Sequence, residues 1–163
     1  MPIIEETIDI AVVPADVFRF CHDAASRPEW DELVLRVEFL TPAPMRLGTL
    51  LRIDAKPGGR STVFSWDAEV ISYHFPLGSK VRVLDTAFSS PFGPGSEVSW
   101  EFSSSGGGTR VTWTWKYKAR GFIANIRDML GGRAATQRAI RNSLKNLKTM
   151  LEGGRRAGTS SRS

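Results

Sequence analysis

The chain has 163 residues, 41% of them apolar and 24% charged, a composition typical of one globular domain and not of a disordered or fibrous chain. The first residues carry acids where a signal peptide carries basic residues, and no run approaches the roughly 20 apolar residues of a membrane span. We therefore expect a cytoplasmic protein with no transmembrane segment. The single cysteine, Cys21, excludes an internal disulfide.

The net charge of +5 is unevenly distributed along the chain. Residues 1–119 contain 12 Lys and Arg against 15 Asp and Glu, a net charge of −3, whereas residues 120–163 contain 10 against 2, a net charge of +8. Such a basic segment suits an anionic surface or nucleic acid as a partner, but a solvated helix face followed by a basic tail gives the same counts. The second interpretation is the more common one, and we expect no nucleic-acid partner.

The N-terminal part of the chain carries one strand signal and two helix signals. Four apolar residues between Ile4 and Val12, with acids between them, predict a first strand. Pro14 predicts the start of a short helix that runs to Cys21, because proline is favoured in the first turn of a helix. A second short helix is expected to start near Ser26, which can cap it, and to include residues 27–30.

Beyond residue 32 the apolar residues recur at every second position. Proline and glycine clusters divide this region into short segments, and such short connections favour hairpins. We therefore expect an antiparallel meander. The six strand-like runs are Leu33–Leu40, Thr49–Ala55, Thr62–His74, Lys80–Phe88, Ser96–Phe102 and Thr109–Ala119.

A helical pattern occupies residues 122–151. Its apolar stripe has three- and four-residue spacing, and the pair Gly131–Gly132 is expected to bend or break it. Residues 153–163 are almost free of apolar side chains and are expected to form a disordered basic tail, which leaves residues 1–152 as a single domain. The polar side of the helix carries Arg133, Arg138, Arg141, Lys145 and Lys148.

The last strand-like run has one aromatic face and one polar face, since Val111, Trp113, Trp115 and Tyr117 alternate with polar residues. Comparable alternation selects inward residues on two other strands. Each of these rings taken alone is more often core than ligand contact. Four indoles on one face, however, are hard to pack without gaps, which favours a cavity. The predicted ligand-binding residues are Phe64, Trp66, Trp100, Phe102, Trp113, Trp115, Tyr117 and, in the helix, Met129.

Several short segments, in this order, resemble one known family. They are Pro14–Phe18, Arg27–Asp31, Leu47–Thr49, Gly108–Thr112 and Leu144–Lys148. Together with the order of elements, they are similar to the START-like SRPBCC superfamily, particularly its polyketide cyclase/dehydrase-like, lipid-transport-like branch. The resemblance implies an α+β helix-grip fold, in which a curved antiparallel sheet of about seven strands, two short helices and a long C-terminal helix enclose a cavity. It also implies lipid, sterol or polyketide-like ligands.

Candidates for catalysis are few. Asp85 is expected on an inward strand face, where it would suit a general base, although a solvated acid at a frayed strand end is the simpler interpretation. His74 stands at a strand end, either at the cavity mouth or exposed. His22 beside Asp23 is better explained as a surface turn than as a dyad. Two histidines and one cysteine lack the spacing of a zinc site, so no metal or cofactor is expected.

These observations favour the binding or carriage of a hydrophobic small molecule. A polyketide cyclase or dehydratase, with Asp85 or His74 transferring a proton, is the first alternative. Interaction of the basic helix with an anionic surface or nucleic acid is the second. The loop at residues 91–95 carries Phe92, an apolar ring suited to a pocket lid or to a dimer contact, so a homodimer is left open.

Overall fold

The computed structural model describes residues 1–56, 63–84, 92–118 and 131–160, with side chains described as far as residue 154. Three helices lie in these ranges: α1 (Pro14–Cys21), α2 (Arg27–Trp30) and α4 (Arg133–Ser160). The strands are β1 (Ile3–Ile10), β2 (Val34–Phe39), β3 (Leu50–Ala55), β4 (Phe64–His74), β5 (Gly78–Val83), β6 (Glu97–Ser105) and β7 (Gly108–Lys116).

The seven strands of the described chain form a single antiparallel sheet in the order β1-β7-β6-β5-β4-β3-β2. The predicted meander is confirmed from β2 to β7, where each strand pairs with the next one along the chain. The first strand adds to the far side by pairing with β7, from Ile3 opposite Lys116 to Ile10 opposite Thr109. The sheet therefore ends at β1 on one side and at β2 on the other.

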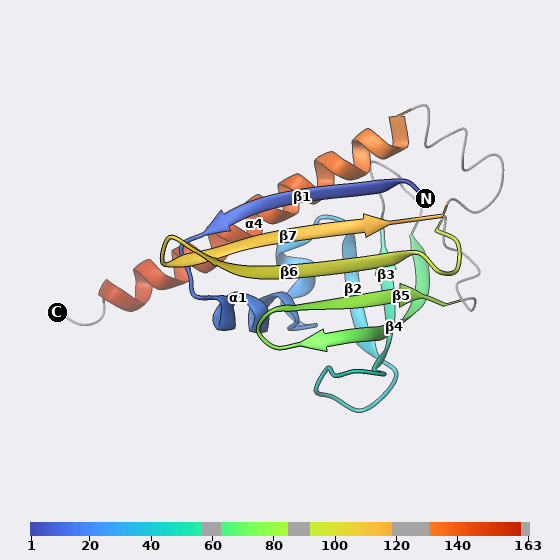
Figure 1. Ribbon diagram of the computed structural model, residues 1–163, viewed down its shortest axis with the longest axis horizontal. Coiled ribbons are helices and arrows are strands. Elements are labelled where there is room, and N and C mark those ends of the chain that lie inside the picture. The colour runs from blue at the N-terminus through green and yellow to red at the C-terminus, as the bar shows by residue number, and fades with distance from the viewer. Residues whose placement is uncertain (57–62, 85–91, 119–130, 161–163) are drawn as a thin grey trace.

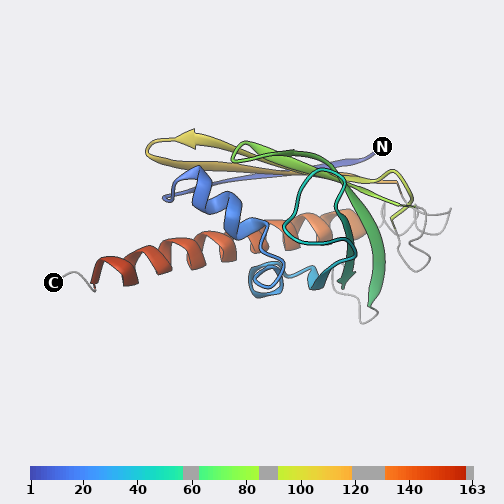
Figure 2. The ribbon, with the colours of Figure 1, turned by 90° about the horizontal axis from the view of Figure 1, so that it is seen from below.

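The sheet curves, and its helices lie on the concave side. Figure 2 shows α4 and the two short helices beneath the arched strands, and Figure 1 shows α4 crossing behind β1 and β7. Two register shifts contribute to the curvature, one in β2 at Val34–Arg36 and one in β4 at Val70–Ser72. Such irregularities bend a strand and increase its twist. The α+β helix-grip fold is confirmed.

The first two helices lie where the sequence predicts them. Helix α1 begins at Pro14 and buries Val17, Phe18 and Cys21, which share one face of the helix. Ser26 occupies the N-cap position of α2, as expected, but its side chain makes no capping hydrogen bond. Its hydroxyl donates instead to Asp23 at 2.6 Å, within the loop that joins the two helices. This bond tightens the loop rather than the helix end.

Helix α4 supplies the apolar cover of the sheet. It begins directly after the glycine pair, where Gly131 has a φ of +122°, a conformation that glycine adopts readily. Ile140, Leu144 and Leu147 are fully buried at four- and three-residue spacing. The helix continues past Glu152, where we expected it to end, to Ser160. Glycines 153 and 154 lower the helix propensity at that point without forbidding a helix.

Basic side chains on α4 hold it against the edge strand β1. Arg141 donates to Glu6 Oε1 at 2.8 Å, and this hydrogen bond holds the pKa of Glu6 below its usual value. Arg133 and Lys148 each donate to a backbone carbonyl of β1 at 2.7 Å. Part of the C-terminal positive charge is thus used inside the fold. Within the described residues, no helix combines the length and the apolar character needed to cross a membrane.

Candidate functional site

A cavity lies between the concave face of the sheet and the segment that runs from α1 through α2. Its wall takes side chains from each strand from β2 to β7 and from residues 21–31, and the described side chains of α4 contribute none. The space open to the centres of water molecules is about 80 Å³. One water needs about 10–15 Å³ by this measure, so the cavity has room for several. Most of the wall is apolar, including Leu33, Val37, Leu51, Ile53, Val81, Val83 and Val98.

Four of the predicted contact residues lie in this wall: Trp66, Trp100, Trp113 and Trp115. The rings of Trp100 and Trp113 stack with centroids 4.2 Å apart. The other predicted residues lie elsewhere. Phe102 and Tyr117 are buried in the core but not in the wall, and Phe64 packs against the core from a half-buried position. Met129 lies outside the described residues.

Arg27 is a wall residue that the sequence analysis did not select. Its Nε donates to Asp31 Oδ2 at 2.6 Å, one helical turn further on. Its guanidinium lies 4.9 Å from the centroid of the Trp30 ring, and 5.0 and 5.4 Å from those of Trp100 and Trp113. Cation–π attraction to these rings adds to the ion pair. The 27/31 spacing was the available signal, since it is typical of an intrahelical ion pair.

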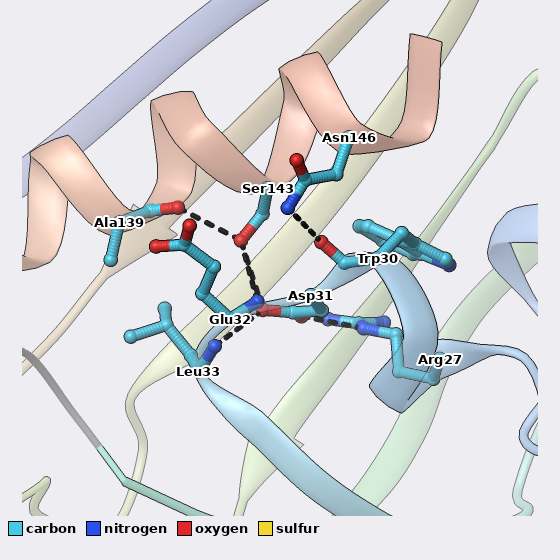
Figure 3. Close-up of polar contacts among 8 residues, drawn as sticks. All are labelled: Arg27, Trp30, Asp31, Glu32, Leu33, Ala139, Ser143 and Asn146. Atoms are coloured by element: carbon cyan, nitrogen blue, oxygen red, sulfur yellow. Dashed lines mark hydrogen bonds and ion pairs between the residues drawn. The ribbon is translucent and has the colours of Figure 1, made fainter. Parts of the chain in front are cut away.

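Asp31 fixes this arrangement, and its side chain is completely buried. Its Oδ1 accepts hydrogen bonds from the Leu33 amide at 3.0 Å and from the Ser143 hydroxyl at 3.3 Å. The single Ser143 hydroxyl proton is shared between Asp31 Oδ1 and Ala139 O, which lies 2.8 Å away, and the hydroxyl oxygen accepts from the Glu32 amide. Figure 3 shows how these contacts connect α2, the start of the chain toward β2, and α4. The buried carboxylate is therefore paired and hydrogen-bonded, as burial of a charge requires.

His22 also faces the cavity, so the surface-turn interpretation is wrong. Its Nδ1 lies 2.7 Å from Phe18 O and its Nε2 lies 2.6 Å from Ser79 Oγ. A carbonyl only accepts, so Nδ1 carries the proton, and in the neutral ring Nε2 accepts the Ser79 hydroxyl proton. Burial lowers the pKa of His22 to about 4, against the effect of the Phe18 hydrogen bond. The ring is therefore neutral near pH 7.

The remaining candidates are less suited to chemistry. Cys21 lies in the wall, but burial raises the pKa of its thiol to about 12, so it is a thiol and not a thiolate near neutral pH. His74 is exposed at the end of β4 and is not part of the wall. Asp85 lies outside the described residues. No group of three His, Cys, Asp or Glu side chains within the described ranges is placed to hold a metal ion.

Phe92, expected at a loop tip, turns inward. Its ring is buried and lies 4.5 Å from the Trp115 ring and 5.7 Å from the Trp66 ring, centroid to centroid. Both indoles belong to the cavity wall, so the Phe92 ring packs against two residues of the wall. A ring so buried offers little surface to a second copy of the chain.

Comparison with known proteins identifies the family. A family model described as "Polyketide cyclase / dehydrase and lipid transport" matches residues 1–152. The chain belongs to this family. The resemblance to the START-like SRPBCC superfamily is thereby confirmed. Among curated proteins, the uncharacterised protein Rv2574 of Mycobacterium tuberculosis is 26% identical over 149 residues, which cover 87% of this chain and 80% of the relative.

Solved structures with the same fold include members with and without a stated activity. TTHA0849 from Thermus thermophilus superposes with a TM-score of 0.75 at 20% identity, covering 94% of this chain and 99% of that one. The Zhui aromatase/cyclase from Streptomyces sp. R1128 superposes with a TM-score of 0.73 at 17% identity, covering 93% of each chain. At these identities the likeness shows a shared fold, and function must be argued from the site.

Proposed function

We propose that this protein binds or carries a hydrophobic small molecule in the cavity between its curved sheet and the α1–α2 segment. The observation that supports this proposal is the mostly apolar wall around about 80 Å³ of space open to water centres. Protein interiors are close-packed and contain few voids larger than one water. An apolar space of this size favours an apolar guest, because the guest removes its own apolar surface from water.

The family narrows the class of ligand. Its description joins polyketide cyclisation with lipid transport, and one similar structure is an aromatase/cyclase. We therefore place lipids, sterols and polyketide-like molecules first among the ligands. In this proposal Trp66, Trp100, Trp113 and Trp115 make the aromatic contacts, because all four belong to the wall.

An enzyme of the cyclase or dehydratase type is the second candidate, and one observation favours it. The pair His22–Ser79 lies in the wall with Nδ1–H oriented by a backbone carbonyl, which leaves Nε2 as the basic nitrogen toward Ser79. A general base works best when its pKa lies near the operating pH. The pKa of His22, lowered to about 4, makes it a weak base. Binding without catalysis therefore ranks first.

Fluorescence of N-phenyl-1-naphthylamine, a dye that brightens in apolar surroundings, tests binding in this cavity. Val98 lies in the wall on β6, whereas its neighbour Ser99 points to the opposite face of the sheet. We expect the wild type to bind the dye, Val98→Phe to bind it about tenfold more weakly or not at all, and the matched control Ser99→Phe to bind as the wild type does. Equal binding by all three proteins would place the dye elsewhere and count against the proposal.

A further inference from the structure

Arg27 is a charged donor in the cavity wall that the fold uses only in part. Its side chain is 19% exposed, and its Nε is committed to Asp31. A guanidinium carries five N–H donors, so four remain on the two terminal nitrogens. Among the described residues these nitrogens have no acceptor, and neither is one of the fully buried unpartnered polar atoms. Because Arg27 lines the cavity, these donors can serve a molecule bound there.

The surroundings of Arg27 hold the guanidinium in one place. Asp31, itself fixed by Leu33 and Ser143, binds one edge, and the rings of Trp30, Trp100 and Trp113 lie around it within 5.4 Å. A donor that the fold has already ordered costs less entropy when a ligand binds. Beside aromatic walls it is also less screened by water, so a hydrogen bond to a ligand there is stronger than at the surface.

The other polar groups of the wall point to the same kind of ligand. The acceptor groups of the wall already receive hydrogen bonds. Both oxygens of Asp23 accept from its own loop, Asp31 accepts from Arg27 and from the Leu33 amide, and His22 Nε2 accepts from Ser79. Two wall indoles, those of Trp113 and Trp115, have buried N–H groups without a partner in the described chain. The wall thus has donors without a partner, whereas each of these acceptor groups already receives at least one hydrogen bond.

We propose that Arg27 is the subsite for an acceptor oxygen of the ligand, a ketone carbonyl or a carboxylate, while the apolar wall binds the rest of the molecule. This inference rests on the proposed function. A carboxylate gains a charge-assisted bond and can accept from both terminal nitrogens. The nearby carboxylates of Asp23 and Asp31 repel a further anion, whereas a neutral ketone meets no such repulsion. A ligand whose only polar group is a cationic amine offers the Arg27 donors no acceptor.

Four naphthalenes of one shape test the chemistry: 2-acetylnaphthalene, 2-naphthoate, 2-ethylnaphthalene and 2-(aminomethyl)naphthalene. Titration of ¹⁵N-labelled wild-type protein by NMR gives each Kd from the indole N–H signals. We expect the ketone, the carboxylate or both to bind about tenfold or more tightly than 2-ethylnaphthalene, as a hydrogen bond to a charged group allows. The amine offers Arg27 no acceptor, so its affinity should not depend on Arg27. Whichever of the ketone and the carboxylate binds more tightly identifies the preferred oxygen. That ligand should also shift the Arg27 Nε–H signal.

Arg27→Gln is the decisive variant, and Arg19→Gln is its matched control. Arg19 lies on α1, also pairs with an aspartate, and is not in the wall. We expect Arg27→Gln to bring the oxygen ligands to within about threefold of 2-ethylnaphthalene. The comparison is the ratio of the two affinities within each protein, so a general change in the cavity affects both ligands alike, and Arg19→Gln should retain the wild-type preference. If Arg27→Gln does not fold, the relative affinities of the four ligands for the wild type and the shift of the Arg27 Nε–H signal test the subsite.

The outcomes separate this inference from the proposed function. If the wild type binds all four naphthalenes with similar affinity, the Arg27 subsite is overturned and the hydrophobic cavity stands. If the wild type prefers the oxygen ligands but Arg27→Gln keeps that preference, the subsite is assigned to the wrong residue. If none of the four binds, the proposed function fails, and the inference fails with it.

Discussion

Replacing Asp31 with alanine should destabilise the protein by about 3–5 kcal/mol, the usual cost of removing one partner of a buried ion pair. The structure explains the magnitude. Asp31 is completely buried and accepts from Arg27 at 2.6 Å and from the buried Leu33 amide at 3.0 Å. Its removal leaves a largely buried guanidinium without its anion and a buried amide without an acceptor, which alone costs about 1–3 kcal/mol.

Asp16 supplies a matched control on α1. It pairs with Arg19 at 3.3 Å, as Asp31 pairs with Arg27, but both side chains are more than 60% exposed. Exposed ion pairs contribute about 0–1 kcal/mol, so Asp16→Ala should change the free energy of unfolding by less than about 1 kcal/mol. Urea denaturation followed by tryptophan fluorescence measures both variants. In a thermal melt, Asp31→Ala should lower the Tm by roughly 10 °C.

Equal stability of Asp31→Ala and Asp16→Ala would contradict this prediction, because the contacts in Figure 3 would then contribute no more than a surface pair. Ser143→Ala gives an intermediate test. It removes the hydroxyl that contacts Asp31 and accepts from the Glu32 amide, but it leaves the Arg27–Asp31 pair in place. We expect it to cost about 1 kcal/mol, the typical net value of one hydrogen bond.

Three further predictions follow from single positions. Burial lowers the pKa of His22 from 6.5 to about 4, so the unfolded chain takes up this proton first as the pH falls. Relative to His22→Gln, the wild type should therefore lose up to about 3 kcal/mol of stability between pH 6.5 and 4 in urea titrations. A stability difference that stays constant over this pH range would contradict the prediction. A Cβ at Gly78 would lie 2.6 Å from Trp100 O, whereas one at Gly153 meets nothing within 4 Å. In thermal melts, Gly78→Ala should destabilise the protein by about 1–3 kcal/mol, and Gly153→Ala, in α4, should stabilise it by up to about 1 kcal/mol. The reverse order of stability would contradict the close approach of β5 to β6 at Gly78. Cys21 should resist iodoacetamide at pH 8 in the native protein and react in urea, whereas rapid native alkylation, detected by mass spectrometry, would show that the thiol is not buried.

The sheet could be predicted from the sequence because alternation directly reports which face of a strand is apolar. The run beginning at Thr109 became β7, and the run beginning at Thr49 became β3, each within one or two residues of its predicted start. Helix α1 has its predicted bounds because Pro14 marks its first residue. The alternation of apolar and polar residues does not show how deeply a side chain is buried. Trp100 and Phe102 share one face of β6, yet Trp100 lines the cavity and Phe102 lies in the packed core.

The polar part of the site was largely missed, for a different reason. Arg27 and His22 belong to a helix and a loop whose positions over the sheet depend on tertiary packing, and no local period encodes that placement. Ser79 could have been found, because it alternates with Val81 and Val83 on β5 and therefore shares their inward face. A serine among inward valines was the available signal for a polar group in the wall.

The central claim is that the cavity binds a hydrophobic molecule, and native mass spectrometry with organic extraction, on protein purified from its own host, tests it most directly. The account predicts a copurified apolar molecule of defined mass that carries a ketone or carboxylate oxygen. The molecule should remain with Ser99→Phe and be lost from Val98→Phe, which fills the wall position in β6. An apolar molecule retained equally by both variants would show that the ligand binds elsewhere and would contradict the account.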